Sequence, residues 1–372
     1  MKGAVQIRTK NKITDALTVI FSAYVCFCAL VHPERTAADV SAALALSVRA
    51  VVPSLFAFSV GFRIIAPSLC AMMSKMKILS RFFGVSAGGL CMMFSGLLSG
   101  FPMGAVVYSE LYERGQISKE EGESLMPFCN NAGAAFLIGS VGEKMYGDAG
   151  IGVMLILCQT AASLFGIMLT KRKRKNVGSG VCAAFPETKF SDVSRAVGAG
   201  GKTMLDVCAY ITFFYTLSCA IGADVHAHGA IKAAICGFFE ISSGIKALSE
   251  CGGFYPFLLG ATVGFSGISV YMQVGGACGG DCMKYYLRGK IQSAALSGGI
   301  CAALSFFFGD APAFFDMFGG RAFVCARAAY FALVFSSMCA IGICIAALFL
   351  SKNTKLVTLH KKIKKGWKNR AR

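Results

Sequence analysis

Two clusters of polar residues interrupt long apolar stretches of the chain. In the first, Asn130 and Asn131 lie between Pro127 and Gly133. Proline removes a helical hydrogen-bond donor and glycine permits positive φ, so a helix is expected to break here. Only such a break lets adjacent side chains face one cavity, because neighbours on an intact helix point about 100° apart. An amide pair offers donors and acceptors, and we therefore expect a solute-binding site here.

The second cluster is a carboxylate followed by two hydroxyls inside the apolar segment 230–248. Glu240 precedes Ser242 and Ser243 there, and ionisable residues at membrane depth tend to be functional. Three further polar residues of apolar segments complete the expected substrate site: Arg49, Ser266 and Gln273. The alternative interpretation is that the arginine reaches the membrane interface. The serines, and Gln159 of the segment 150–170, would then form inter-helix hydrogen bonds rather than contacts with a ligand.

Glycine and proline mark where the backbone is expected to leave the helical conformation. We expect breaks at Gly100, Pro102, Gly104, Pro127, Gly133, Gly264 and Gly267. Small residues also let helices approach closely, which is the structural alternative. The glycine-rich runs do not match a phosphate-binding loop.

No pattern predicts a catalytic or metal centre. Most of the 17 cysteines lie in apolar stretches, and Cys278 and Cys282 are four residues apart without a nearby histidine. Paired Cys-x-x-Cys spacing and Ser/His/Asp spacing are not found. We therefore expect no enzyme activity, no cofactor and no metal.

Composition indicates what holds these residues. Of 372 residues, 55% are hydrophobic and 15% are charged, with a mean hydropathy of +0.62, whereas soluble domains carry about 25% charged residues. The net charge of +18 comes from basic residues that cluster at the ends of apolar runs. This pattern argues against a soluble enzyme or a nucleic-acid partner and predicts an all-α, polytopic membrane protein.

Ten apolar segments approach or reach the ~20 residues of a spanning helix: about 13–31, 40–66, 86–108, 125–143, 150–170, 206–222, 230–248, 254–278, 290–309 and 327–350. Basic clusters at the N-terminus, at 171–175 and in the tail are expected in the cytoplasm, which makes both termini cytoplasmic. The acidic loops 32–39 and 222–229 are expected on the other side. Basic clusters on the same side of the membrane must be separated by an even number of crossings. Because five segments lie between successive clusters, each half is expected to contain one re-entrant or interrupted segment.

Two short motifs recur in the two halves of the chain. The stretch 112–117 (YERGQI) resembles 286–291 (YLRGKI), and the tripeptide FSG occurs at 94–96 and at 265–267. These matches predict an internal repeat, whose two copies could run parallel or inverted. The expected organisation is an N-terminal cytoplasmic segment with the first transmembrane helix (1–39), a first gate-like repeat (40–170), a basic cytoplasmic linker (171–195), a second gate-like repeat (196–351) and a basic cytoplasmic tail (352–372).

Four motifs carry a resemblance to a known family. The stretches 100–105 (GFPMGA), 128–133 (FCNNAG), 237–245 (GFFEISSGI) and 264–274 (GFSGISVYMQV) resemble the YlbJ-type sporulation integral membrane proteins, which carry nucleoside-recognition "gate" domains. The chain departs from the family pattern at Ala132, Ala134, Ser242 and Ser243. The resemblance implies a role in endospore formation and transport of dipicolinic acid across the outer forespore membrane.

The expected function is therefore transport of a small organic anion through the lipid bilayer, with dipicolinic acid as the specific candidate. Glu240 would repel such an anion unless it is protonated or paired, so we expect it to serve coupling to H⁺ or Na⁺, or gating. The alternatives are a carrier of nucleosides or other polar solutes, and a non-transporting sporulation scaffold or gate subunit. The basic tail is expected to contact anionic lipid. The sequence is compatible with an oligomer as well as with a monomer.

Overall fold

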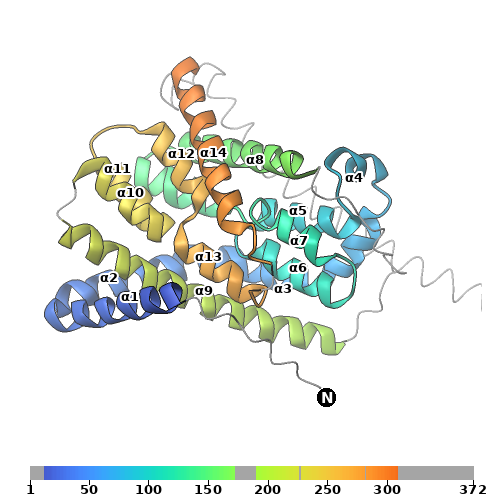
Figure 1. The fold of residues 1–372 in the computed structure, drawn as a ribbon, viewed down its shortest axis with the longest axis horizontal. Helices are drawn as coiled ribbons and strands as arrows, with labels where there is room; N and C mark the ends of the chain where they lie inside the picture. The colour runs from blue at the N-terminus through green and yellow to red at the C-terminus, as the bar shows by residue number, and fades with distance from the viewer. Residues whose placement is uncertain (1–11, 172–189, 226–227, 281, 309–372) are drawn as a thin grey trace, which may run out of the picture. The chain divides into compact units, whose positions relative to one another are not determined.

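The computed structural model describes residues 12–171, 190–225, 228–280 and 282–308, and these are all helical or connecting segments (Figure 1). The chain divides into two units, Met1–Phe314 and Phe315–Arg372, and all described residues lie in the first. The all-α class is thereby confirmed for the described residues. The expected segment 327–350 and the basic tail lie outside them.

Among the residues that the structure describes, four helices are long and apolar enough to cross a membrane: Leu55–Met73, Ala149–Thr170, Asp192–Asp224 and Pro256–Ala277. A fifth candidate is the pair Lys77–Phe83 and Ala87–Ser99, which is bent by 80°. Several of the ten expected segments are therefore shorter than a full span. The reason is that the helices break within them.

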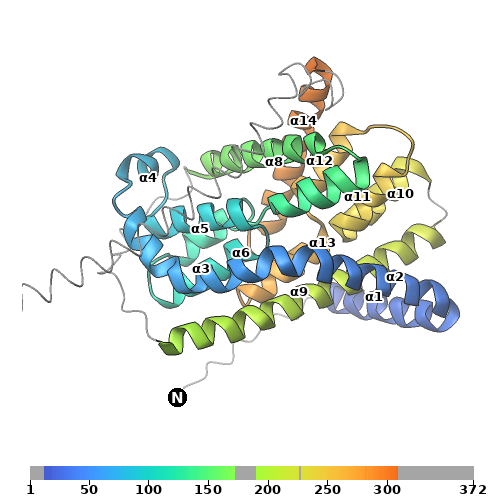
Figure 2. The same ribbon diagram turned by 180° about the vertical axis from the view of Figure 1, so that it is seen from behind.

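The first part of the chain forms a long helical rod. Helix α1 (Lys12–Val31) turns back into α2 (Pro33–Leu46), which continues through the π-helical turn η1 (Ser47–Val51) into α3 (Val52–Met73). Pro53 lies just after this turn. Because proline has no backbone N–H group, it removes a helical hydrogen bond, and such a loss is a common cause of local distortion in a helix. Figure 2 shows α2, η1 and α3 in line beside α9 (Phe190–Asp224). The expected boundary at 39–40 thus lies inside α2.

A helical hairpin follows. The short helix α4 (Lys77–Phe83) leads into α5 (Ala87–Ser99), which breaks at 100–102 and returns as α6 (Met103–Glu113). Ser86, the N-cap of α5, donates its backbone N–H to Glu121 Oε1 at 2.6 Å. Since Glu121 lies in α7 (Lys119–Leu125) directly after the hairpin, α5 begins at the same end of the molecule to which α6 returns.

The next helix is interrupted. After α7 the chain is non-helical over 126–133, then continues as the π-helical η2 (Phe136–Tyr146) and turns into α8 (Ala149–Thr170). Asp148 caps α8 by accepting a hydrogen bond from Gly150 N at 2.7 Å. Helix η2 packs along α8, so this second element is a broken helix paired with an intact one.

The remaining helices contain two more breaks. Helix α9 is followed by α10 (Gly229–Phe239) and α11 (Ile241–Ser249), which are separated only by Glu240. Helices α12 (Pro256–Phe265) and α13 (Gly267–Ala277) are separated only by Ser266, and α14 (Tyr286–Phe308) completes the described part. Helices α10 and α11 pack against each other, as do α12 and α14.

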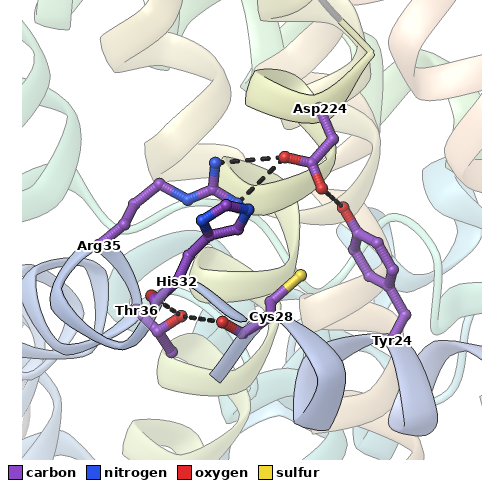
Figure 3. Close-up of polar contacts among 6 residues, drawn as sticks. All are labelled: Tyr24, Cys28, His32, Arg35, Thr36 and Asp224. Carbon is purple, nitrogen blue, oxygen red and sulfur yellow. Dashed lines mark hydrogen bonds and ion pairs between the residues drawn. The ribbon is translucent and has the colours of Figure 1, made fainter. Parts of the chain in front are cut away.

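The α5–α6 hairpin and the packed pair α10–α11 lie toward opposite ends of α9 (Figure 1). Near its first turns, a pocket of about 200 Å³ is lined by Arg195 of α9 together with Glu110 and Arg114 from the end of α6. At its last turn, Asp224 accepts hydrogen bonds from Tyr24 Oη at 2.7 Å and from the Arg35 guanidinium at 3.1 and 3.2 Å (Figure 3). Arg35 and Asp224, which belong to the stretches 32–39 and 222–229 expected on one side, are therefore in contact. The first stretch is not the expected loop, because it forms the first turns of α2.

Candidate functional site

Four helix breaks are linked in what we call the break junction: 100–102, 126–133, Glu240 and Ser266. The first two are in contact, the last two are in contact, and Lys290 connects the pairs. The first contact joins the α5–α6 break to the non-helical stretch. Phe101 N donates to Asn131 O at 2.8 Å, and Ala105 N in the first turn of α6 donates to Asn130 Oδ1 at 3.2 Å. Asn130 thus caps α6 from a different segment, because Pro102 offers no side-chain cap.

The two asparagines also hold their own stretch in shape. Asn130 Nδ2 donates to Met126 O at 2.9 Å, and Asn131 Nδ2 donates to Phe128 O at 3.0 Å. Asn131 Oδ1 accepts from Ser163 Oγ at 3.0 Å. In this conformation each amide oxygen and nitrogen has a partner within the protein, so solute binding by these amides remains a prediction and requires that some of these bonds open.

Gln159 of α8 supports the same stretch. Its amide accepts from Ala132 N at 3.1 Å and donates to Ala132 O at 2.7 Å. The pair replaces the two backbone hydrogen bonds that the unwound helix has given up, as buried peptide groups require. Gln159 was expected to form either an inter-helix hydrogen bond or a ligand contact. In this structure both of its amide atoms instead bind the backbone of Ala132 in the non-helical stretch.

Glu240 occupies the break between α10 and α11. Its side chain is buried, with 1% exposure, and Oε2 accepts from Ser243 N at 2.8 Å, which makes it the N-cap of α11. Ser243 Oγ donates to Glu240 O at 3.0 Å and accepts from Ser218 Oγ of α9 at 2.7 Å. Ser242 is buried beside them. A carboxylate is stabilised at the positive, amino-terminal end of a helix, so this position partly offsets the free-energy cost of burying Glu240.

Ser266 forms the break between α12 and α13 and carries a φ of 70°. A non-glycine residue in the left-handed region is strained, and such residues concentrate at functional sites. The next residue, Gly267, packs so closely against the α10–α11 break that a Cβ there would lie 3.0 Å from Phe239 O and 3.2 Å from the Glu240 Cα. The third and fourth breaks are therefore in contact.

Lys290 joins the two sides of the junction. Its side chain is buried, at 2% exposure, and Nζ donates to Asn130 O at 2.6 Å and to Ser266 Oγ at 3.2 Å. The ammonium also lies 5.8 Å from the centre of the Tyr286 ring. Lys290 is not among the site residues predicted from the sequence. A lysine in the first turns of a 23-residue apolar helix is nevertheless a visible signal of function.

The other predicted site residues are distributed as follows. Gln273 lies buried in α13, where Nε2 donates to Ser269 Oγ at 3.1 Å and Oε1 has no hydrogen-bond partner. Arg49 is exposed in η1 and is not part of the junction. Gly100, Pro102, Pro127, Gly133 and Gly267 lie at the breaks.

Two expected breaks are not breaks. Gly104 lies inside α6 and Gly264 lies inside α12. Each is a close-packing position instead, since a Cβ on Gly104 would lie 1.9 Å from Cys129 O and one on Gly264 would lie 2.5 Å from Ser293 O. The alternative reading of the glycines as packing residues therefore holds at these two positions.

The comparison with known proteins agrees with the motif resemblance. The chain is similar to the "Sporulation integral membrane protein YlbJ" of Bacillus subtilis (strain 168), with 24% identity over 313 residues that cover 72% of this chain and 76% of that protein. No family model matches the chain, and no solved structure matches it. The similarity and the apolar helices together support an integral membrane protein.

Proposed function

We propose that this protein transports a small organic anion across a membrane during endospore formation, with dipicolinic acid as the specific candidate. The observation that carries the proposal is the break junction, in which four interrupted helical segments from distant parts of the chain surround buried polar side chains. Non-helical backbone at membrane depth is tolerated where it lines a cavity or is buried in protein, and in transporters such breaks form the solute site.

We further infer that α5–α6 and α10–α11 are re-entrant hairpins that enter the membrane from opposite sides. Each hairpin is followed by a broken helix, α7–η2 or α12–α13, and then by an intact helix, α8 or α14. This order recurs in both halves, and the entry of the two hairpins from opposite sides would make the repeat an inverted one. In this scheme the break at 126–133 corresponds to the break at Ser266. The short sequence matches instead aligned 94–96 with 265–267.

The proposal is therefore transport rather than catalysis, with a coupling ion (H⁺ or Na⁺) as a further proposed element. Under the inverted scheme, α1, α2–α3, α7–η2 and α8 cross the membrane and α5–α6 does not. Four crossings place the N-terminus and the linker at 171–195 on one side, which is the cytoplasm by the distribution of lysine and arginine. The outer forespore membrane is the proposed location.

Epitope tags test this topology. Tags inserted after Gly115 and after Lys175 are expected to be reached by antibody from one side of the membrane, and tags after Val225 and after Gly252 from the other. Gly115 and Gly252 are suitable sites because nothing lies within 4 Å of the position of a Cβ on either residue. A tag at Gly115 that is reached from the side opposite to the tag at Lys175 would contradict the hairpin α5–α6.

Flux into liposomes tests the function itself. The purified full chain is expected to give saturable uptake of labelled pyridine-2,6-dicarboxylate above that of protein-free liposomes, with competition by small aromatic carboxylates and none by uridine. Uridine uptake without dicarboxylate uptake would instead identify a nucleoside-type carrier. Absence of flux of either solute would favour the scaffold alternative.

A further inference from the structure

We propose that Lys290, together with Ser266 and the amino end of α13, binds a carboxylate group of the transported solute. This inference rests on the proposed transport function and names the recognition element of that site. It concerns a small carboxylate, because the single ammonium group matches one carboxylate in charge.

The first reason is that the buried ammonium has no acidic partner. Both oxygens that accept from Nζ, Asn130 O and Ser266 Oγ, are uncharged. No ion pair joins Lys290 to a carboxylate in the described part of the chain. An ammonium offers three donors and two are used, with the Tyr286 ring nearby. A buried charge without a counter-ion is costly, and an incoming carboxylate supplies that counter-ion.

The second reason is the state of α13. Ser266 is its N-cap, yet no side chain accepts a hydrogen bond from the first turn of this helix. By contrast, Asn130 caps α6 and Glu240 caps α11. The amide groups at the amino end of a helix favour anions. Lys290 contacts Ser266, so the ammonium and the uncapped helix end lie together.

The third reason is the strain at Ser266. It is the one non-glycine residue with positive φ among those the structure describes, and the surrounding contacts must maintain that conformation. In this structure, Lys290 bridges Asn130 O and Ser266 Oγ and thus ties the non-helical stretch to the α12–α13 break. A carboxylate that takes over the ammonium group would release this bridge, which links solute binding to movement of the two broken helices.

The test uses the full chain in liposomes with three variants. Lys290→Met keeps the length and the apolar stem of the side chain and removes the charge, and Lys290→Arg keeps the charge. Arg288→Met is the matched control, since Arg288 is exposed on the same helix. We expect Lys290→Met to raise the KM for pyridine-2,6-dicarboxylate at least about tenfold, which corresponds to the loss of one hydrogen bond to a charged group. Arg288→Met is expected to stay within about twofold.

A second readout separates recognition from folding. Wild-type protein is expected to prefer the dicarboxylate over its monoamide, 6-carbamoylpyridine-2-carboxylate, and Lys290→Met to lose most of that preference while Lys290→Arg retains it. The thermal midpoint of Lys290→Met is expected to stay close to that of the wild type, because removing a buried charge without a counter-ion offsets the loss of the hydrogen bonds to Asn130 O and Ser266 Oγ. A purely structural lysine would instead lower the midpoint and leave the preference intact.

The outcomes distinguish this inference from the proposed function. Dicarboxylate flux by the wild type with an unchanged KM and an unchanged preference in Lys290→Met overturns the assignment of Lys290 alone. Absence of flux in the wild type overturns the transport function and this inference with it.

Discussion

Alanine at Gly96 or Gly104 is expected to reduce solute flux at least tenfold and to lower the thermal stability of the protein. These glycines lie in the two arms of the α5–α6 hairpin, and both face the carbonyl of Cys129 in the non-helical stretch. A Cβ would lie 1.7 Å from Cys129 O at Gly96 and 1.9 Å from it at Gly104. Both contacts are with backbone, which cannot rotate away, so the hairpin must move by more than 1 Å.

That movement affects the junction directly. The bonds from Phe101 N to Asn131 O and from Ala105 N to Asn130 Oδ1 span the same interface and would lengthen or break. Overpacking of this kind costs about 1–3 kcal/mol, and each buried amide left without a partner adds about 1–3 kcal/mol. Flux should fall further than stability, because the geometry of the asparagine stretch changes before the protein unfolds.

Two matched substitutions control for alanine itself. Gly61→Ala in α3 and Gly139→Ala in η2 meet no atom within 4 Å, so they should leave flux unchanged and stabilise the helix slightly. Thermal unfolding of purified protein and liposome uptake measure the two effects. Equal behaviour of Gly104→Ala and Gly61→Ala would show that the hairpin does not pack on Cys129 as described.

The sequence predicted the all-α class of the described residues and some of the places where helices break, because both follow from local composition. Pro102, Pro127 and Gly133 interrupt apolar runs, and the chain is non-helical at each of these positions. The same logic was wrong at Gly104 and Gly264. A glycine that breaks a helix and a glycine that lets another backbone approach look alike in one sequence, and only the neighbouring Cys129 or Ser293 carbonyl distinguishes them.

The partners of the polar residues could not be derived from the sequence. Asn130 and Asn131 were assigned to solute because adjacent amides in an apolar segment need partners, but the partners observed include backbone groups of α6 and a serine of α8. Those contacts join residues 25 and 32 positions apart, and tertiary packing sets them. Lys290 carried a local signal as a lysine in an apolar helix, but its partner could not be derived, because its contact with Asn130 O spans 160 residues.

Glu240→Gln is expected to separate solute binding from ion-driven accumulation. Glutamine keeps the shape of the side chain and an amide oxygen that can accept from Ser243 N, so α11 retains its cap and the protein its stability. Only the negative charge and the capacity to take up a proton or hold a cation are lost. Solute exchange between equal concentrations should therefore stay within about threefold of the wild type, while accumulation driven by a proton or Na⁺ gradient should fall at least tenfold.

The charges at the junction give the physical reason. A dicarboxylate brings two negative charges into a buried site, and Lys290 balances one of them. Glu240 is the buried carboxylate of the break junction among the described residues, and its charge would repel the second carboxylate unless a proton or Na⁺ accompanies it. Removing the charge of Glu240 removes the need for that cation, so the solute can still enter but is no longer coupled to the gradient.

Two further variants complete this experiment. Glu240→Ala removes the cap of α11 as well as the charge, which costs about 1 kcal/mol, and should lower the thermal midpoint as well as accumulation. Glu250→Gln neutralises an exposed carboxylate at the other end of α11 and should change neither. If Glu240→Gln accumulates dicarboxylate as the wild type does under the same gradient, the coupling ion does not act through Glu240, and this residue serves only as the cap that holds the break between α10 and α11.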